Sequence, residues 1–405
     1  MAIPPAPAAN EGFQIRLGPF FLDSQQEREY FKKQDVRFNS DKEINRIEVF
    51  FNDEAHHFII YKMGAGAAND YAEGLRDIED GATDMLSNNI VAAWQDAMNI
   101  ALPPTTAYFW DAGSVLDLNF HLRNYDPDSI LASEGFINVY TQPSGTADQE
   151  MISQLIPIDI IAFLFGTGDV GSSLIIPNNG QEVVFSEGIA LPFTDETWHL
   201  WLLSTHTHAR GTDYDIYLRN ANGSRGQQIF EGFYNFNYTF NQGYYDWEHP
   251  PVRYFNPLLP VNMNQFEGGL IHEAKYVNTG PDTLYWGNTT EDEMMLFFVQ
   301  YTLAPLSATS LDTDLAQRAG LSVYPNPAAA ETEISYTLDR AAEVEAGVFD
   351  LHGRRDQGLV AGPQSPGFYR HPFSPSQAGL PAGVYFVRLS IDGLAAGLKK
   401  IILLE

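Results

Sequence analysis

Histidine and methionine are the residues of this 405-residue chain whose types and spacing point to chemistry. The chain has 10 histidines, eight of them before residue 305, and no cysteine. Two patterns stand out, His56-His57 and His206-Thr207-His208. Neutral imidazoles bind several transition metals, and a thioether beside them favours Cu(I) because sulfur is a soft ligand. Since no thiolate is available, histidines combined with a methionine are the route to a copper site.

The second pattern follows the apolar run 198–203, which predicts a β-strand. In a strand, residues i and i+2 face the same side, so His206 and His208 could converge on one metal. The alternative is a pair of surface histidines on a strand.

The adjacent His56 and His57 pose a different geometric problem. Neighbouring strand residues point to opposite faces, so both can bind one metal only at a bulge or a strand end. The preceding Asn52-Asp53-Glu54 is compatible with such an irregularity. The alternative is one buried and one exposed histidine.

Two more residues complete the candidate set. In LDLNFHLRNY, the alternation predicts Leu118 and Phe120 on one face of a strand, with Asn119 and His121 on the other. Considered alone, His121 fits a core or surface histidine better than a ligand. Met294, in TEDEMMLFF, would alone be a core filler, and it becomes a candidate ligand only beside imidazoles.

The elements that must position these side chains are mostly short strands. Apolar and polar residues alternate between clusters of Gly, Asn, Asp and Pro, which predicts an all-β chain. Residues 71–101 interrupt this pattern and could be helical. Strands are expected at 14–17, 48–51, 58–61, 115–122, 136–140, 198–203, 214–218, 268–277 and 294–301.

The motifs together resemble the copper type II, ascorbate-dependent monooxygenases, the relatives of peptidylglycine α-hydroxylating and dopamine β-monooxygenases. The resemblance rests on the segments NDEAHHFIIYKM, LNFHL, HTHARG, QGYYDWEHPP and YVNTGPDTLYWGNTTEDEMM, in that order along residues 12–305. It implies two jelly-roll-like antiparallel sandwiches side by side, residues 12–150 and 151–305, each carrying one copper. It also implies C–H hydroxylation with O₂ and an ascorbate-type reductant.

The resemblance assigns roles residue by residue. It implies that His56, His57 and His121 bind the electron-transfer copper, and that His206, His208 and Met294 bind the oxygen-activating copper. Met295 is adjacent and stays an alternative to Met294. His249, in EHPP, matches a family position that is interpreted as structural, while His199 and His272 match none.

Departures from the family pattern concern the substrate. Peptidylglycine enzymes have Arg, Asn and Tyr where this chain has Ser204, Leu296 and Phe298. These differences argue against a C-terminal glycine substrate. The aromatic stretch 233–247 could line an apolar substrate surface, although sandwich core is the stronger expectation. The substrate stays unidentified, and a non-enzymatic, copper-binding surface protein that retains the fold is the alternative function.

The last 85 residues form a separate unit. Its YPNP opening, its LPAGVYFVRL strand and its LKKIILLE terminus resemble the C-terminal sorting domain of Bacteroidetes type IX secretion. That resemblance implies a small Ig-like sandwich over 321–405 after a 306–320 linker. It also implies the secretion machinery as a partner and a secreted or cell-surface location, with a signal peptide removed before the 1–11 tail.

The net charge of the chain restricts the classes of partner it can bind. The formal net charge is −29, and residues 1–305 carry 15 basic and 41 acidic side chains. Such acidity argues against nucleic acid as a partner. No apolar run reaches the roughly 18 residues of a transmembrane helix. A calcium-binding adhesin is a weaker alternative, because the acidic residues form no repeated oxygen-ligand loop.

Overall fold

β-Strands make up almost all of the regular structure. The computed structural model describes residues 3–35, 40–51, 55–63, 74–77, 89–94, 98–192, 194–236, 240–306, 318–328, 331–349, 355–391 and 394–404. The chain divides into two compact units, Met1–Pro305 and Leu306–Glu405. Within the described residues, no helix has the length and apolar character needed to cross a bilayer. The all-β prediction is confirmed.

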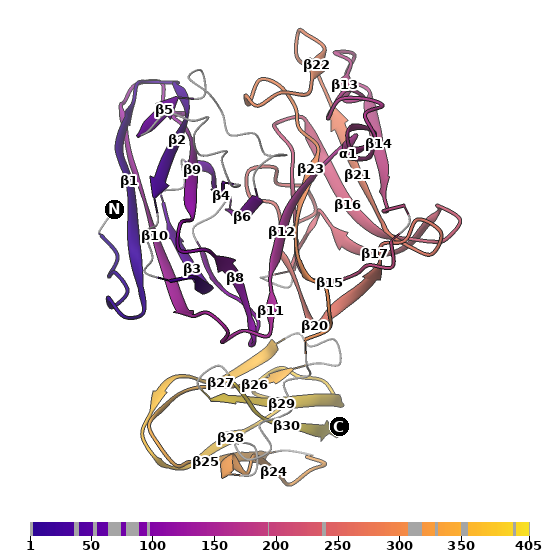
Figure 1. The fold of residues 1–405 in the computed structure, drawn as a ribbon. Coiled ribbons are helices and arrows are strands. Elements are labelled where there is room, and N and C mark those ends of the chain that lie inside the picture. Colours follow the sequence, from indigo (N-terminus) through magenta and orange to yellow (C-terminus); the bar gives the residue numbers. More distant parts are fainter. Residues whose placement is uncertain are drawn as a thin grey trace. The chain divides into compact units, whose positions relative to one another are not determined.

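The first part of unit Met1–Pro305 is a sandwich of two sheets, drawn in indigo and purple in Figure 1. One sheet has the order β1-β10-β3-β8-β11, with β7 also on β3, and the other has the order β5-β2-β9-β4-β6. The strands are β1 (Gly12–Leu22), β2 (Glu27–Asp35), β3 (Lys42–Phe50), β4 (Ala55–Lys62), β5 (Leu75–Asp77), β6 (Asn89–Trp94), β7 (Met98–Ala101), β8 (Thr106–Trp110), β9 (Val115–Arg123), β10 (Leu131–Pro143) and β11 (Gln149–Glu150).

Strand β9 shows how alternation positions the candidate ligands. Leu118 and Phe120 are fully buried in the core of this sandwich. The side chains of Asn119 and His121, on the opposite face, are also buried, but their partners are polar. The predicted division of this strand into two faces is confirmed. One face holds the two sheets together, and the other presents polar groups to the site.

The helix expected over residues 71–101 does not form where the structure describes this segment. Its described parts are the strands β5, β6 and β7, and its other residues lie outside the described part of the chain. Ile90, Val91 and Ile100 are buried in the core, and β6 and β7 pair with β4 and β3. Cross-strand pairing and burial therefore override the local helix propensity of Ala, Met and Glu.

The second part of the same unit is also a sandwich, drawn from magenta to orange in Figure 1. Its sheets have the orders β12-β23-β15-β20 and β14-β21-β16-β17, with the small pairs β13-β22 and β18-β19. The elements are β12 (Ile152–Pro157), α1 (Ile160–Leu164), β13 (Ile175–Ile176), β14 (Glu182–Ile189), β15 (Thr197–His206), β16 (Gly211–Arg219), β17 (Arg225–Glu231), β18 (Tyr234–Asn235), β19 (Phe240–Asn241), β20 (Arg253–Asn262), β21 (Leu270–Val277), β22 (Leu284–Tyr285) and β23 (Leu296–Thr302).

The two sandwiches share a seam. Trp201, Leu202 and Phe298 of the second sandwich are buried in the same apolar cluster as the core of the first. Beside them, Gln300 Nε2 donates hydrogen bonds to Tyr108 Oη (2.6 Å) and Ser153 Oγ (2.9 Å). Burial of this apolar surface and the two hydrogen bonds donated by Gln300 Nε2 hold the sandwiches together. Residues on both sides of position 150 can therefore contribute to one site.

The unit Leu306–Glu405 has its own β-core. Its sheets are β24-β25-β28 and β27-β26-β29-β30. Alternating burial along β25 and β29 directs Ile334, Tyr336, Val387 and Leu389 into one apolar cluster. The strands are β24 (Ser322–Tyr324), β25 (Thr332–Leu338), β26 (Ala342–Phe349), β27 (Arg355–Gln364), β28 (Gly367–Phe373), β29 (Gly383–Ile391) and β30 (Leu394–Leu403).

Candidate metal centre

Five histidines from the two sandwiches meet in one cluster. The ring nitrogens of His56, His57 and His121 lie within 4.8 Å of one another, and so do those of His56, His206 and His208. His56 belongs to both triads, and its ring centroid is 5.0 Å from that of His121 and 5.4 Å from that of His206. The two predicted ligand sets are therefore contiguous, and His56 joins them.

A β-bulge places His56 and His57 together. In the pairing of β4 with β9, Ala55 lies opposite Leu122 and His57 opposite His121, and the register shifts between them. His56 is thus the extra residue of the bulge, which frees its ring from strict alternation. The expected irregularity lies at His56 itself, while Asn52, Asp53 and Glu54 lie outside the described residues.

Glu27 orients the imidazole of His121. His121 Nε2–H donates to Glu27 Oε1 at 2.7 Å, so Nδ1 carries the free lone pair. His121 Nδ1 is buried and has no hydrogen-bond partner. Burial alone would raise the pKa of Glu27, but hydrogen bonds from His121 and Thr290 hold that pKa at about 2. The arrangement is a carboxylate–histidine pair with one nitrogen left for a metal.

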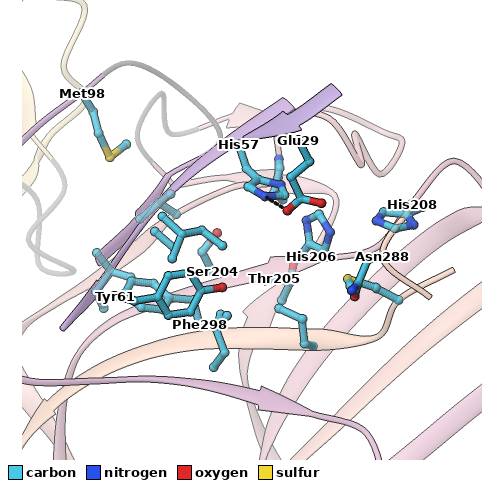
Figure 2. A pocket seen from close by; sticks show the side chains of 18 of the residues that line it. Glu29, His57, Tyr61, Met98, Ser204, Thr205, His206, His208, Asn288 and Phe298 are labelled. Carbon is cyan, nitrogen blue, oxygen red and sulfur yellow. Dashed lines mark ion pairs between the residues drawn. The ribbon is translucent and has the colours of Figure 1, made fainter. Parts of the chain in front are cut away.

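His57 is oriented through an amide. Its Nε2–H donates to Asn119 Oδ1 at 2.8 Å, and Asn119 Nδ2 donates in turn to Glu29 Oε1 at 2.9 Å. The 3.6 Å approach of His57 Nε2 to Glu29 Oε1 is dashed in Figure 2. This chain of hydrogen bonds also leaves Nδ1 of His57 as the nitrogen with a free lone pair.

Past the end of β15, the backbone turns around a buried carboxylate. The strand ends at His206, so the predicted strand spacing does not extend to His208. Glu293, which is fully buried, accepts hydrogen bonds from the backbone N–H groups of His208 (2.9 Å) and Arg210 (2.6 Å). Burial raises the pKa of Glu293 to about 7. The His206 and His208 ring centroids lie 5.2 Å apart because this loop is held in place.

His208 completes its orientation through the backbone. Its Nδ1–H donates to the carbonyl oxygen of Asp292 at 3.2 Å, which leaves Nε2 free. Glu293, next along the chain, also accepts from the N–H of Met294 at 3.3 Å. The segment 292–294 therefore fixes both the H-T-H loop and the methionine.

The structure separates the two neighbouring methionines. Met294 lines a cavity together with His206 and His208. Met295 is fully buried in the core of the second sandwich. A thioether at the cavity wall can reach a metal held by the histidines, whereas the side chain of Met295 packs among core residues. The geometry therefore favours Met294 as the candidate ligand.

Burial keeps the imidazoles of His56, His206 and His208 uncharged. The pKa values of His56 and His206 are well below the usual range, because of burial first and then of the neighbouring histidines. Burial likewise lowers the pKa of His208 to about 4. Neutral imidazole is the metal-binding form. At neutral pH these side chains are therefore in the state that a metal requires.

The donor set fits copper. His56 Nε2 and His121 Nδ1 are buried nitrogens without partners, and an unpaired buried polar atom is costly unless a ligand completes it. Imidazole nitrogens with a thioether are suited to Cu(I), and the Glu27 carboxylate, the Asn119 amide and the Asp292 carbonyl accept hydrogen bonds from the rings. The described residues of the cluster thus provide a plausible site for copper.

A cavity opens beside these residues, between the two sandwiches (Figure 2). It encloses about 1040 Å³, counting space open to solvent at its mouth. Ser204, Leu296 and Phe298, the positions that depart from the family pattern, all line it. No described residue of the aromatic stretch 233–247 lines it. Phe233 and Trp247 pack against the core of the second sandwich, as the core interpretation expects.

His272, His199 and His249 belong to neither triad. His272 is fully buried and bonded to Tyr214 Oη at 2.7 Å, with Glu187 Oε2 at 3.4 Å. His199 and His249 are partly exposed.

Several polar residues around the site are not predicted by any local sequence pattern. Glu27, Glu29 and Glu293 stand far along the chain from the histidines that they support, so no local pattern reveals them. Another group, Asp213 and Asp215 with Glu231, brings three carboxylates within 4.8 Å of one another on β16 and β17. Only the Asp-x-Asp alternation signalled part of it.

Comparisons with known proteins assign no family. No family model and no curated protein matches the sequence. Similar solved structures include the major capsid protein P2 of bacteriophage PM2, with 9% identity, a TM-score of 0.31, and coverage of 73% of this chain and 99% of that one. They also include PNGase F of Flavobacterium meningosepticum, with 13% identity, a TM-score of 0.31, and coverage of 73% and 98%. A β-glucuronidase of Ruminococcus gnavus has 10% identity, a TM-score of 0.19, and coverage of 63% and 45%. This likeness concerns the all-β fold alone.

Proposed function

We propose that this chain is a secreted, copper-dependent monooxygenase that hydroxylates a C–H bond of an organic substrate with O₂ and an ascorbate-type reductant. The observation that supports this proposal is a cluster of five histidines, of which His57, His206 and His208 line a cavity together with Met294. When bound, copper would supply the one-electron chemistry and O₂ activation that amino-acid side chains lack.

The protein's own residues would divide the work. His56, His57 and His121 would hold one copper, and His206, His208 and Met294 a second. Glu27, Asn119 and the Asp292 carbonyl hold the rings of His121, His57 and His208 in the tautomers that present a free nitrogen. Fixing these rings in advance lowers the cost of assembling the site.

The cavity would hold the substrate against the second ligand set. Its lining includes His206, His208 and Met294 at one end and apolar side chains from both sandwiches along its walls. Such walls exclude water from the substrate. The site thus provides orientation and a dry environment next to the candidate catalytic residues.

Copper loading followed by ascorbate-dependent O₂ uptake tests the proposal. We expect two coppers per chain, and uptake stimulated by an oxidisable substrate. His121→Ala and Met294→Ala should each lower copper binding and uptake, while His199→Ala, outside the cluster, should not. Fewer than two coppers, unchanged in both variants, would overturn the site. Two coppers without uptake across a broad substrate panel would instead favour a non-enzymatic copper-binding protein.

We also propose that residues 321–405 are a type IX sorting domain. The proposal is supported by its sequence motifs and by the separate β-core of this unit. Deletion of residues 306–405 in a host with that machinery should retain the protein inside the outer membrane. Unchanged release into the medium would contradict the assignment.

A further inference from the structure

The walls of the cavity carry little charge. Among the described residues that line it, none is lysine or arginine. Most of the lining is apolar, with Phe31, Ile59 and Met98 from the first sandwich and Leu202, Val252 and Phe298 from the second. Burying an ion against such walls without a partner is strongly unfavourable. An anionic ligand would find no counter-charge here.

Among the described lining residues, the one carboxylate, that of Glu29, is already engaged. Glu29 Oε1 accepts from Asn119 Nδ2 at 2.9 Å and lies 3.6 Å from His57 Nε2. A ligand cation at Oε1 would have to compete with these groups. Because Glu29 already interacts with Asn119 and His57, it is a weakened partner for an amine.

The apolar lining extends away from the histidines along two strands. On β4, His57, Ile59 and Tyr61 are spaced two residues apart, so their side chains share one face. On β15, His206, Ser204 and Leu202 repeat this arrangement. At about 3.3 Å per residue, four residues span roughly 13 Å. Figure 2 shows Tyr61 and Phe298 near each other, away from the ring of His208.

We infer that this cavity binds an uncharged, elongated, largely apolar molecule about 10 Å long, with one end beside His206, His208 and Met294. The identification of that end as the reactive end of the cavity rests on the proposed function. The binding preference itself depends only on the shape and charge of the cavity. A ring or alkyl chain would contact Ile59, Leu202 and Phe298, and burial of its surface would drive binding.

Three probes of equal skeleton test this preference in the metal-free, full-length chain. They are 4-phenyl-1-butanol, 4-phenylbutanoate and 4-phenylbutylamine, which are neutral, anionic and cationic at pH 7.5. Isothermal titration calorimetry should give the alcohol a dissociation constant at least about tenfold lower than that of either ion. Equal binding of the three, tighter binding of an ion, or no binding of the alcohol would overturn the inference.

Two variants check that binding occurs in this cavity. Ser204→Arg places a cation on its wall and should reverse the preference in favour of 4-phenylbutanoate, whereas Ser224→Arg, on an exposed turn, should not. If Ser204→Arg fails to fold, Ile59→Asn should weaken binding of the alcohol at least about fivefold while leaving the melting curve cooperative. Unchanged preference in the folded variants would place the binding elsewhere.

The assay separates this inference from the proposed function. Binding is measured without copper, reductant or turnover. Preferential binding of the alcohol without copper-dependent O₂ uptake would support the inferred ligand preference and contradict the proposed monooxygenase activity. Copper-dependent O₂ uptake together with preference for a charged probe would support the activity and contradict the ligand preference.

Discussion

The imidazole rings of His56 and His206 lie 5.4 Å apart, although they belong to different β-sandwiches. His56 also lies 5.0 Å from His121 and 5.8 Å from His208. One side chain thus joins two ligand sets that chain position would assign to separate domains.

Replacement of His56 should therefore affect both sets. We expect His56→Ala to weaken copper binding of the first set, where it is a ligand, by more than about 100-fold, and that of the second set, where it is a neighbour of the ligands, by about 10–100-fold. His121→Ala should affect one site. Competition with a chromophoric Cu(I) chelator resolves the two affinities, with His199→Ala as the control. A His56→Ala protein that loses one site only would show that His56 is not shared.

Removal of the Glu27 charge should loosen His121. Glu27→Gln keeps the size of the side chain but weakens the acceptor for His121 Nε2–H and for Thr290 Oγ1, which lies 2.6 Å from Glu27 Oε2. Copper affinity of the first set should fall about 10–100-fold, and that of the second much less. Glu134→Gln, which alters a surface ion pair with Arg16, is the matched control. Wild-type affinity in Glu27→Gln would show that this carboxylate does not orient the ligand.

The two methionines should separate metal binding from stability. Met294→Ala should reduce Cu(I) affinity of the second set with a smaller change in melting temperature. Met295→Ala should leave Cu(I) binding largely intact and lower the free energy of unfolding by about 2–5 kcal/mol, because it opens a cavity in the core. Chelator competition and denaturant unfolding of both variants provide the two measurements. The reverse pattern would transfer the ligand role to Met295.

The carboxylates on β16 and β17 should make stability depend on pH. Burial, followed by the charges of Asp213 and Glu231, raises the pKa of Asp215 from 3.8 to about 6. The native state therefore holds a proton that the unfolded chain releases near pH 4, so the contribution of this group falls as pH rises toward 6. Asp215→Asn should thus raise the free energy of unfolding at pH 7.5 by on the order of 1–2 kcal/mol, and far less at pH 4.

The control for this prediction is Asp128→Asn, at an exposed position. Urea unfolding at the two pH values provides the measurement. Equal effects of Asp215→Asn at pH 4 and pH 7.5 would contradict the prediction.

Local sequence patterns predict much of this architecture. Alternation identified the strands and both faces of β9, because one buried face leaves a period of two in the sequence. The rule that adjacent strand residues diverge predicted a bulge or a strand end at His56-His57 if both bind one metal, and a bulge lies there. Residue type and spacing drew attention to the histidine patterns, and the family resemblance assigned His121 and Met294 as candidate ligands.

Contacts between residues far apart in the sequence could not be predicted from local patterns. Glu27 lies 94 positions from His121, and Glu293 lies 85 positions from His208. The contact of His56 with His206 depends on how two sandwiches pack, which no local period encodes. The possible helix over residues 71–101 is absent from the described parts of that segment for the same reason, because those parts pair with strands distant in sequence.

The seam formed by Trp201, Leu202 and Phe298 has a consequence for modularity. These side chains complete the core of the other sandwich. Neither sandwich could therefore be replaced by a homologous domain unless the apolar surfaces on both sides of the seam also matched. Proteolytic cleavage of the turn at 144–146 would likewise leave two fragments that stay associated, because the seam between the sandwiches would remain buried. The boundary near residue 150 thus separates two segments of the sequence that fold into one compact unit.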